Sequence, residues 1–298
     1  MELDLLWGTQ PLSVPFDFLY LFSMKTTRLA IIGAGNMARS LVGGLIADGW
    51  DPDYISVSDP DDATLTSMGN TFSVRTETNN RAIVTGSEVA VLAVKPQHLA
   101  VVARELSDIV QKQAPLVISI AAGVRVADLQ RWLGGSCALV RCMPNTPALV
   151  QSGATALYAN PQVTNEQREL AENILRSVGL VVWIEEEDLM DAVTALSGSG
   201  PAYILLIIEA LQQAGEKLGL GAQTARLLAL QTAFGAAKLA LESSEEPAAL
   251  RRRVTSPGGT TERAIGILEE GGLQRLFLDA LHAARARSRE LADKFGAT

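Results

Sequence analysis

Cysteine and histidine are scarce in this sequence of 298 residues. Each occurs twice, as Cys137, Cys142, His98 and His282. Two cysteines cannot form a disulfide framework, and these four residues do not have the spacing of metal ligands. The histidines are also far apart in the sequence, which argues against a histidine-based triad. We therefore expect no metal site.

Positive charge is in deficit as well. The chain has 25 Lys and Arg against 33 Asp and Glu, a formal net charge of −8 at pH 7. An acidic surface argues against nucleic acid or an anionic membrane as the main partner. Apolar residues make up 48% and aromatic residues only 5%. Such a composition is typical of layered α/β structure and packed helices, and the length suggests two domains.

A targeting segment is not evident at the start of the chain. A signal peptide begins with basic residues, whereas Glu2, Asp4 and Asp17 are acidic. No apolar run reaches the roughly 20 residues that a membrane span needs. A second methionine, Met24, precedes the first strong strand. We interpret residues 1–23 as an N-terminal extension or a mis-assigned start, and expect a cytoplasmic protein.

The first motif is glycine-rich and follows an apolar run, Arg28 to Ile32. It reads Gly33-Ala34-Gly35-Asn36-Met37-Ala38, the G-x-G-x-x-A form of the dinucleotide fingerprint. Its glycines permit a tight turn and a close approach of the pyrophosphate, and Ala38 allows close packing. A helix from Asn36 to Ala47, ended by Gly49, would point its free N–H groups at phosphates. The rival interpretation is a plain turn.

The second strand, Tyr54 to Ser58, ends at residues that can select the cofactor. An acidic residue about 20 places beyond the fingerprint usually binds the adenosine ribose and favours NAD, and Asp59 fits. Ser58 can instead receive the 2′-phosphate of NADP. A third interpretation is structural, with both residues capping a helix that starts near Asp61.

Further strands alternate with helices. We expect strands at Glu88 to Ala93, Leu116 to Ile120 and Cys137 to Cys142, and a pair at Thr155 to Tyr158 and Leu180 to Ile184 around a helix from Asn165 to Ser177. This alternation predicts an α/β fold with a doubly wound parallel sheet. Ligands of such sheets bind at the carboxyl ends of the strands. We assign residues 24–184 to this nucleotide-binding Rossmann domain.

Strand patterns stop after residue 184, and residues 185–298 predict an all-helical domain. Long helices are expected at Pro201 to Lys217 and Ala222 to Leu241. The segment Ala202 to Ile208 is apolar nearly all round, which is typical of a helix buried on every side. We expect a second subunit to bury it. The alternative is a core helix covered by its own chain.

A second glycine motif occurs in this half, at Ser256 to Thr261. Ser256 suits an N-cap and Pro257 the first position of a helix that runs through Glu270. Gly258 and Gly259 would weaken that helix by roughly 1 kcal/mol each. They make sense where free N–H groups contact an anion such as a carboxylate. The alternative is an ordinary capped helix.

Five segments together resemble the pyrroline-5-carboxylate reductase family, over about residues 27 to 290. They are Gly33 to Ala38, Ala93 to Gln97, Arg141 to Pro147, Asp191 to Tyr203 and Val254 to Thr261. The resemblance implies reduction of 1-pyrroline-5-carboxylate to proline by NADPH, with NADH as an alternative. It also implies a homodimer of interlocked helices that assembles further into a decamer, and an active site between the nucleotide domain and helices of the dimer.

The resemblance also implies roles for individual residues. Thr261 approaches the ring nitrogen and is the expected catalytic residue. Residues expected to bind the cofactor are Gly33, Ala34, Gly35, Asn36, Met37, Ser58, Asn80, Ala93, Val94, Lys95, Pro96, Ala121, Ala122 and Gly123. Residues expected at the substrate are Glu187, Ser256, Gly258, Gly259, Thr260 and Thr261.

Two other functions would also use a dinucleotide-binding domain. A hydroxyacid dehydrogenase with a helical domain would use a lysine on the first helices after the nucleotide domain, but the first lysine there is Lys217. A dinucleotide sensor without activity would keep Gly33 and Gly35, but it has no need of the turn from Ser256 to Thr261. The reductase accounts for all of these motifs.

Overall fold

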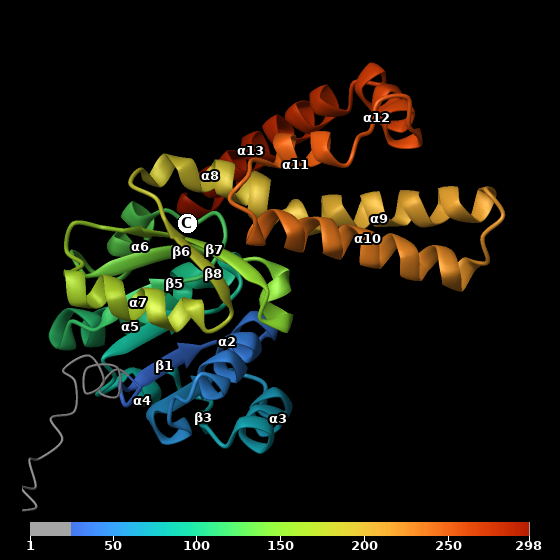
Figure 1. Ribbon diagram of the computed structural model, residues 1–298. Coiled ribbons are helices and arrows are strands. Elements are labelled where there is room, and N and C mark those ends of the chain that lie inside the picture. Colours follow the sequence, from blue (N-terminus) through green and yellow to red (C-terminus); the bar gives the residue numbers. More distant parts are fainter. Residues whose placement is uncertain (1–24, 298) are drawn as a thin grey trace, which may run out of the picture.

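The computed structural model describes residues 25–297. The extension expected at residues 1–23 lies outside the described residues. The predicted division after residue 184 falls just beyond the last strand, between the sheet and a series of helices. Figure 1 shows the two parts, with the sheet in blue to green and the helical arms in yellow to red.

The described residues form an eight-stranded sheet in the order β3-β2-β1-β4-β5-β6-β7-β8. The strands are β1 Leu29–Ile32, β2 Ile55–Ser58, β3 Arg75–Glu77, β4 Val89–Leu92, β5 Leu116–Ser119, β6 Leu139–Met143, β7 Gly153–Ala159 and β8 Gly179–Trp183. Strands β1 to β6 are parallel, but β7 pairs with β6 antiparallel and with β8 parallel. The expected doubly wound parallel sheet is confirmed for β1 to β6, and the expected pair β7 and β8 extends it in the antiparallel direction.

Helices cover both faces of this sheet. They are α2 Asn36–Ala47, α3 Asp62–Phe72, α4 Asn80–Val84, α5 Pro96–Gln113, α6 Val126–Trp132 and α7 Asn165–Arg176, with short turns η1 Pro52–Tyr54 and η2 Thr146–Val150. Strands β1, β4 and β5 are buried along their whole length, because apolar side chains on both faces meet helices. The expected helix from Asn36 to Ala47 is confirmed, whereas β3, α4 and α6 were not foreseen.

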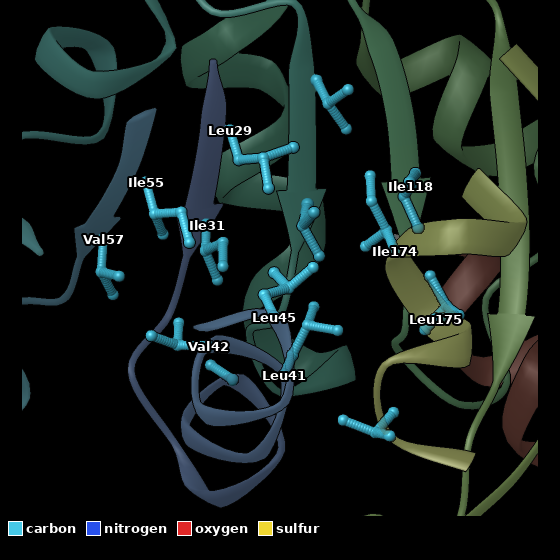
Figure 2. Packing of buried hydrophobic residues seen from close by; sticks show 14 of the residues in the cluster. Leu29, Ile31, Leu41, Val42, Leu45, Ile55, Val57, Ile118, Ile174 and Leu175 are labelled. Atoms are coloured by element: carbon cyan, nitrogen blue, oxygen red, sulfur yellow. The ribbon is translucent and has the colours of Figure 1, made fainter. Parts of the chain in front are cut away.

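One core cluster shows how the layers meet. Leu41 and Leu45 of α2 pack on Leu29 and Ile31 of β1, as Figure 2 shows. Side chains of α3 and α7 complete this layer. The opposite face is covered by α4, α5 and α6. The two clusters fix the strands, so their carboxyl ends form a rigid edge.

The carboxy-terminal half is helical, as expected. Its elements are η3 Glu187–Leu189, α8 Met190–Val193, the π-helical turn η4 Thr194–Gly198, α9 Gly200–Lys217, α10 Ala222–Glu242, α11 Pro247–Arg253, α12 Thr260–Glu270 and α13 Leu273–Gly296. Helices α9 and α10 form a hairpin that projects from the sheet, and α11 and α12 lie on a second arm (Figure 1). Helix α13 returns from that arm toward the sheet (Figure 1).

Apolar side chains cover the surface of the α9–α10 hairpin. Leu205 and Leu206 of α9 are 62% and 64% exposed, and Phe234 of α10 is 61% exposed. The expectation that the chain itself leaves this segment uncovered is therefore confirmed. By length and composition one helical stretch of the described residues, Glu187–Lys217, is apolar enough to cross a membrane, but a single helix of this kind is weak evidence for a membrane span.

Candidate functional site

The fingerprint loop joins β1 to α2 at the carboxyl edge of the sheet. Gly33 has φ +101°, which strongly favours glycine. A Cβ built on Gly33 would lie 2.8 Å from the carbonyl oxygen of Ala93. Its N–H donates to the carbonyl oxygen of Ser58 at 2.7 Å. Gly33 therefore brings together the loops that follow β1, β2 and β4, and its positive φ fits the tight turn predicted there.

The N-terminus of α2 is open to a ligand. Within residues 25–297, no atom lies within 4 Å of a Cβ built on Gly35, the N-cap residue. Gly35 has no side chain, so the N-cap residue makes no side-chain cap hydrogen bond. The first N–H groups of a 12-residue helix are then free to meet an anion. These features fit the pyrophosphate of a dinucleotide.

Asp59 lies against the fingerprint loop. Its Oδ2 accepts a hydrogen bond from the Ala34 N–H at 2.9 Å, and its Oδ1 accepts one from the Asp61 N–H at 3.0 Å. The cap of α3 is Asp61, whose carboxylate accepts from Ala63 and Thr64. The interpretation that Asp59 caps this helix is therefore wrong. Its carboxylate lies where β2 ends, beside the loop expected to bind the pyrophosphate.

Ser58 has a different environment from the one expected. Its side chain is fully buried, and its hydroxyl donates to Oδ1 of Asn80 at 2.8 Å. A buried hydroxyl with a partner does not present itself to a 2′-phosphate, so a direct contact is not supported. Asn80, the first residue of α4, also donates from Nδ2 to Glu105 at 3.1 Å. Ser58 thus orients Asn80, which is only partly buried.

The remaining cofactor residues lie at the ends of β4 and β5. Val94 and Lys95 lead into α5, with Lys95 as its extended N-cap and Pro96 as its first residue. The Ile120 N–H donates to the carbonyl oxygen of Leu92 at 3.2 Å, so the two strand ends are adjacent. The loop with Ala121, Ala122 and Gly123 follows directly. The expected nicotinamide loops are therefore brought to the same edge as the fingerprint.

Glu187 makes an ion pair in this structure. Its Oε1 accepts from Arg141 Nη1 at 2.7 Å and from the Val126 N–H at 2.8 Å. Arg141, on β6, is 5% exposed. A buried guanidinium without an ion-pair partner would destabilise the fold, so Arg141 needs the carboxylate of Glu187. Within the described protomer the carboxylate of Glu187 binds protein groups at the start of α6, and its expected place at the substrate stays a prediction.

Asn145 was not among the predicted site residues, although it lies within the segment Arg141 to Pro147 that resembles the family. Its Nδ2 donates to the carbonyl oxygen of Ser197 at 3.1 Å, and its Oδ1 accepts from the Ala154 N–H at 2.9 Å. Ser197 lies in the π-helical turn η4. Such turns are frequent at functional sites. In the sequence, the segment Asn145-Thr146-Pro147 directly after β6 could have indicated this residue.

The segment Ser197 to Pro201 continues the helical stretch through η4 into α9. Ser199 at the N-cap of α9 makes no side-chain cap bond within the described chain. A Cβ on Gly198 would meet the methyl carbon of Met143, and this flexible side chain would have to shift. Gly198 therefore packs against the end of β6, whereas Gly200 does not.

The second glycine motif forms a turn before α12. Helix α12 begins at Thr260 with Gly259 as its N-cap, so the expected start at Pro257 is wrong. Gly258 has φ +73°, a conformation that helices do not contain. Glu262 accepts from the Gly258 N–H at 2.7 Å. The side chains of Ser256, Thr260 and Thr261 are exposed, and the predicted end at Glu270 is confirmed.

The two glycine motifs are not neighbours within the described protomer. The first motif lies after β1, at the carboxyl edge of the sheet. The second lies before α12, at the far end of the second arm (Figure 1). Contacts of α12 are mainly with α13. A site that needs both motifs therefore requires a second chain.

The cysteine thiols and possible metal ligands of the described residues do not point to another type of site. Burial raises the pKa of both thiols, Cys137 and Cys142, which disfavours the reactive thiolate. Among residues 25–297, no group of three or more His, Cys, Asp or Glu side chains is arranged to hold a metal ion. The open loops at the sheet edge are the best candidate site.

Comparisons with known proteins agree with this arrangement. A family model described as pyrroline-5-carboxylate reductase dimerisation matches residues 187–291, and one described as NADP oxidoreductase, coenzyme F420-dependent, matches residues 28–123. A pyrroline-5-carboxylate reductase of Pseudomonas aeruginosa is 50% identical over 273 residues, covering 92% of this chain and 100% of that protein.

Solved structures give the same result. The pyrroline-5-carboxylate reductase of Coxiella burnetii has a TM-score of 0.87 and 49% identity, with 90% of this chain and 99% of that chain covered. The Plasmodium falciparum enzyme, solved with NADP bound, has a TM-score of 0.79 and 28% identity, with 90% and 99% covered. This chain belongs to the pyrroline-5-carboxylate reductase family.

Proposed function

We propose that this protein reduces the imine of 1-pyrroline-5-carboxylate to give L-proline, the last step of proline biosynthesis, with a nicotinamide cofactor. The observation that carries the proposal is the identity of 50% to a reductase of that name along its whole length. The open fingerprint loop and the exposed turn before α12 supply the two binding surfaces that the reaction needs.

The active site is shared between two subunits. One contributes the sheet edge, with Gly33, Gly35, Ala93 and the loop from Ala121 to Gly123. Its partner contributes the turn from Ser256 to Thr261, because this turn is remote from the sheet edge in a single protomer (Figure 1). The exposed apolar hairpin and the dimerisation family model support the pairing.

The reaction needs few acid–base groups from the protein. The cofactor, when bound, supplies a hydride to the imine carbon. The turn before α12 binds the substrate carboxylate through N–H groups and the hydroxyls of Ser256 and Thr260. Thr261 donates a hydrogen bond to the ring nitrogen and orients the imine. Position and orientation supply most of the rate, and solvent is the source of the proton.

Replacing Thr261 tests this mechanism. In Thr261→Ala we expect kcat to fall roughly tenfold or more, because the imine loses its orienting hydrogen bond. The Kd of the cofactor should not change, since the loops that bind it are intact. Thr261→Ser keeps a hydroxyl and is the matched control. Steady-state kinetics with pyrroline-5-carboxylate give both values, and an unchanged kcat in Thr261→Ala would remove this residue from the mechanism.

NADPH is the proposed cofactor, with NADH as a second one. The NADP-bound relative and the NADP oxidoreductase family model support this choice. Against it stands the acidic loop after β2, with Asp59, Asp61 and Asp62. A carboxylate at the end of β2 favours the free ribose hydroxyl and repels the 2′-phosphate. We infer that Asp59 limits the preference for NADPH.

In Asp59→Asn we expect the ratio of kcat/KM for NADPH to kcat/KM for NADH to rise roughly tenfold, because one repulsive charge is removed. Asparagine can still accept the Ala34 hydrogen bond. Asp53→Asn is the control, since this exposed residue lies before the start of β2. Initial rates of NADPH and NADH oxidation measured in parallel decide the matter. An unmoved ratio would mean that Asp59 does not discriminate.

The proposals for the larger assembly and for the cellular location are based on membership of the family. We propose that dimers associate further, into a decamer, and that the protein is cytoplasmic. Residues 24–184 form the nucleotide-binding domain in this proposal, and residues 185–298 form the domain for dimerisation and substrate binding. Light scattering of the purified full chain tests the number of subunits.

A further inference from the structure

The last turn of α13 packs on the loop between β5 and α6. A Cβ built on Gly123 would lie 3.5 Å from two ring carbons of Phe295. Phe295 also packs against the core cluster that contains Ala121 and Val124. In Figure 1 the red end of α13 reaches the sheet near α6, far from the arm where the helix begins. The ring therefore lies directly behind the loop expected at the nicotinamide.

Polar contacts continue this packing. Arg125 Nη2 lies 2.7 Å from Asp293 Oδ1. Arg131 donates to the carbonyl oxygen of Gly296 at 2.5 Å and also pairs with Asp128 at 2.8 Å. The loop and the first turns of α6 are thus tied to one short segment at the end of α13.

Glu187 fixes the other end of the same loop. It accepts from the Val126 N–H, where α6 begins, while paired to Arg141. Both Glu187 and α13 belong to the helical half of the chain. The loop from Ala121 to Val126 is therefore held from outside the nucleotide domain, although its strand, β5, lies within that domain.

We propose that residues 292–297, here called the α13 clamp, position the loop that carries the nicotinamide half of the cofactor. This proposal rests on the proposed role of Ala121 to Gly123. Hydride transfer is sensitive to displacements of a fraction of an ångström, so a loop held from behind keeps the transfer distance short. The dimerisation family model ends at residue 291. The clamp lies beyond the segment that this model describes.

Phe295→Ala tests the clamp. We expect the Kd of NADPH to rise and kcat to fall, each roughly tenfold, because the loop loses its support. The Kd of 2′-phospho-ADP-ribose, which lacks the nicotinamide, should not change. Phe295→Leu, which keeps an apolar side chain, should restore most of the activity. Thermal unfolding and light scattering on the same full-length samples report folding and assembly.

A second variant avoids any loss of core packing. The pair between Arg125 and Asp293 is exposed, with side chains 40% and 69% accessible, so its loss costs little stability. In Asp293→Asn we expect the same pattern as in Phe295→Ala, with a two- to threefold effect as an order of magnitude. This variant keeps the test valid if Phe295→Ala does not fold.

Ala122→Val, a change in the loop itself, separates the two proposals. Ala122 is partly exposed and lies between the buried residues Ala121 and Gly123. If Ala122→Val weakens NADPH binding but Phe295→Ala and Asp293→Asn do not, the clamp is wrong and the loop's role stands. If none of the three affects NADPH, both proposals fail. If Phe295→Ala weakens 2′-phospho-ADP-ribose as much as NADPH, the residue serves stability alone and the clamp is overturned.

Discussion

In Leu206→Glu we expect the dimer to dissociate and nearly all activity to be lost. Leu206 lies on α9 and is 64% exposed in the protomer, so a second chain must cover it if the hairpin is the interface. A carboxylate in that position would be buried without a partner, which costs several kcal/mol. Because a protomer alone does not bring its two glycine motifs together, a folded monomer should bind NADPH but not turn over.

Val101→Glu is the control for this experiment. Val101 lies on α5 of the nucleotide domain and is 68% exposed, so the same kind of substitution occurs outside the hairpin. Light scattering, NADPH binding and the rate with pyrroline-5-carboxylate are measured for both variants. A Leu206→Glu protein that stays dimeric, or a monomer that keeps full activity, would contradict the shared site.

Two inactive variants should restore activity to each other. Gly33→Val breaks the cofactor loop, because φ is +101° and its Cβ would meet Ala93. Gly258→Val breaks the substrate turn, because a β-branched residue at φ +73° is strongly strained. When the two chains are co-expressed in equal amounts, mixed dimers contain one site built from two intact halves. We expect about a quarter of the wild-type activity in the total dimer population.

The reciprocal mixture checks the same point. A chain with both substitutions is co-expressed with the wild-type chain. Both sites of every mixed dimer are then inactive, so about a quarter of the wild-type activity should remain. If each site were built from one chain, the first mixture would be inactive and the second would keep about half. Differently tagged chains allow the mixed dimers to be purified. Melting curves establish that each variant folds.

Patterns local in sequence predicted the nucleotide domain well. The run Arg28 to Ile32 and the fingerprint after it fix a strand, a turn and a helix through neighbouring residues alone. Helix α2 has the predicted bounds. By contrast, β3 is three residues long and its side chains are only partly buried. Its existence depends on pairing with β2, which no local pattern announces.

The candidate site was predicted less completely, because its contacts join distant residues. Glu187 pairs with Arg141, which is 46 residues away, and no local pattern indicates that contact. Ser58 was expected at a phosphate, but the fold buries it beside Asn80, 22 residues on. The turn before α12 shows a third limit. Serine and proline suit a helix start, yet the positive φ of Gly258 delays the helix to Thr260.

The exposed α9–α10 hairpin has a consequence for how the chain matures. The sheet buries its apolar side chains within one chain and is made first during synthesis, so it can fold before synthesis ends. The hairpin cannot hide Leu205 or Leu206 until it meets another copy. Between these two events the new chain exposes a surface that invites aggregation. The yield of enzyme in a cell is then set by how quickly two finished chains meet.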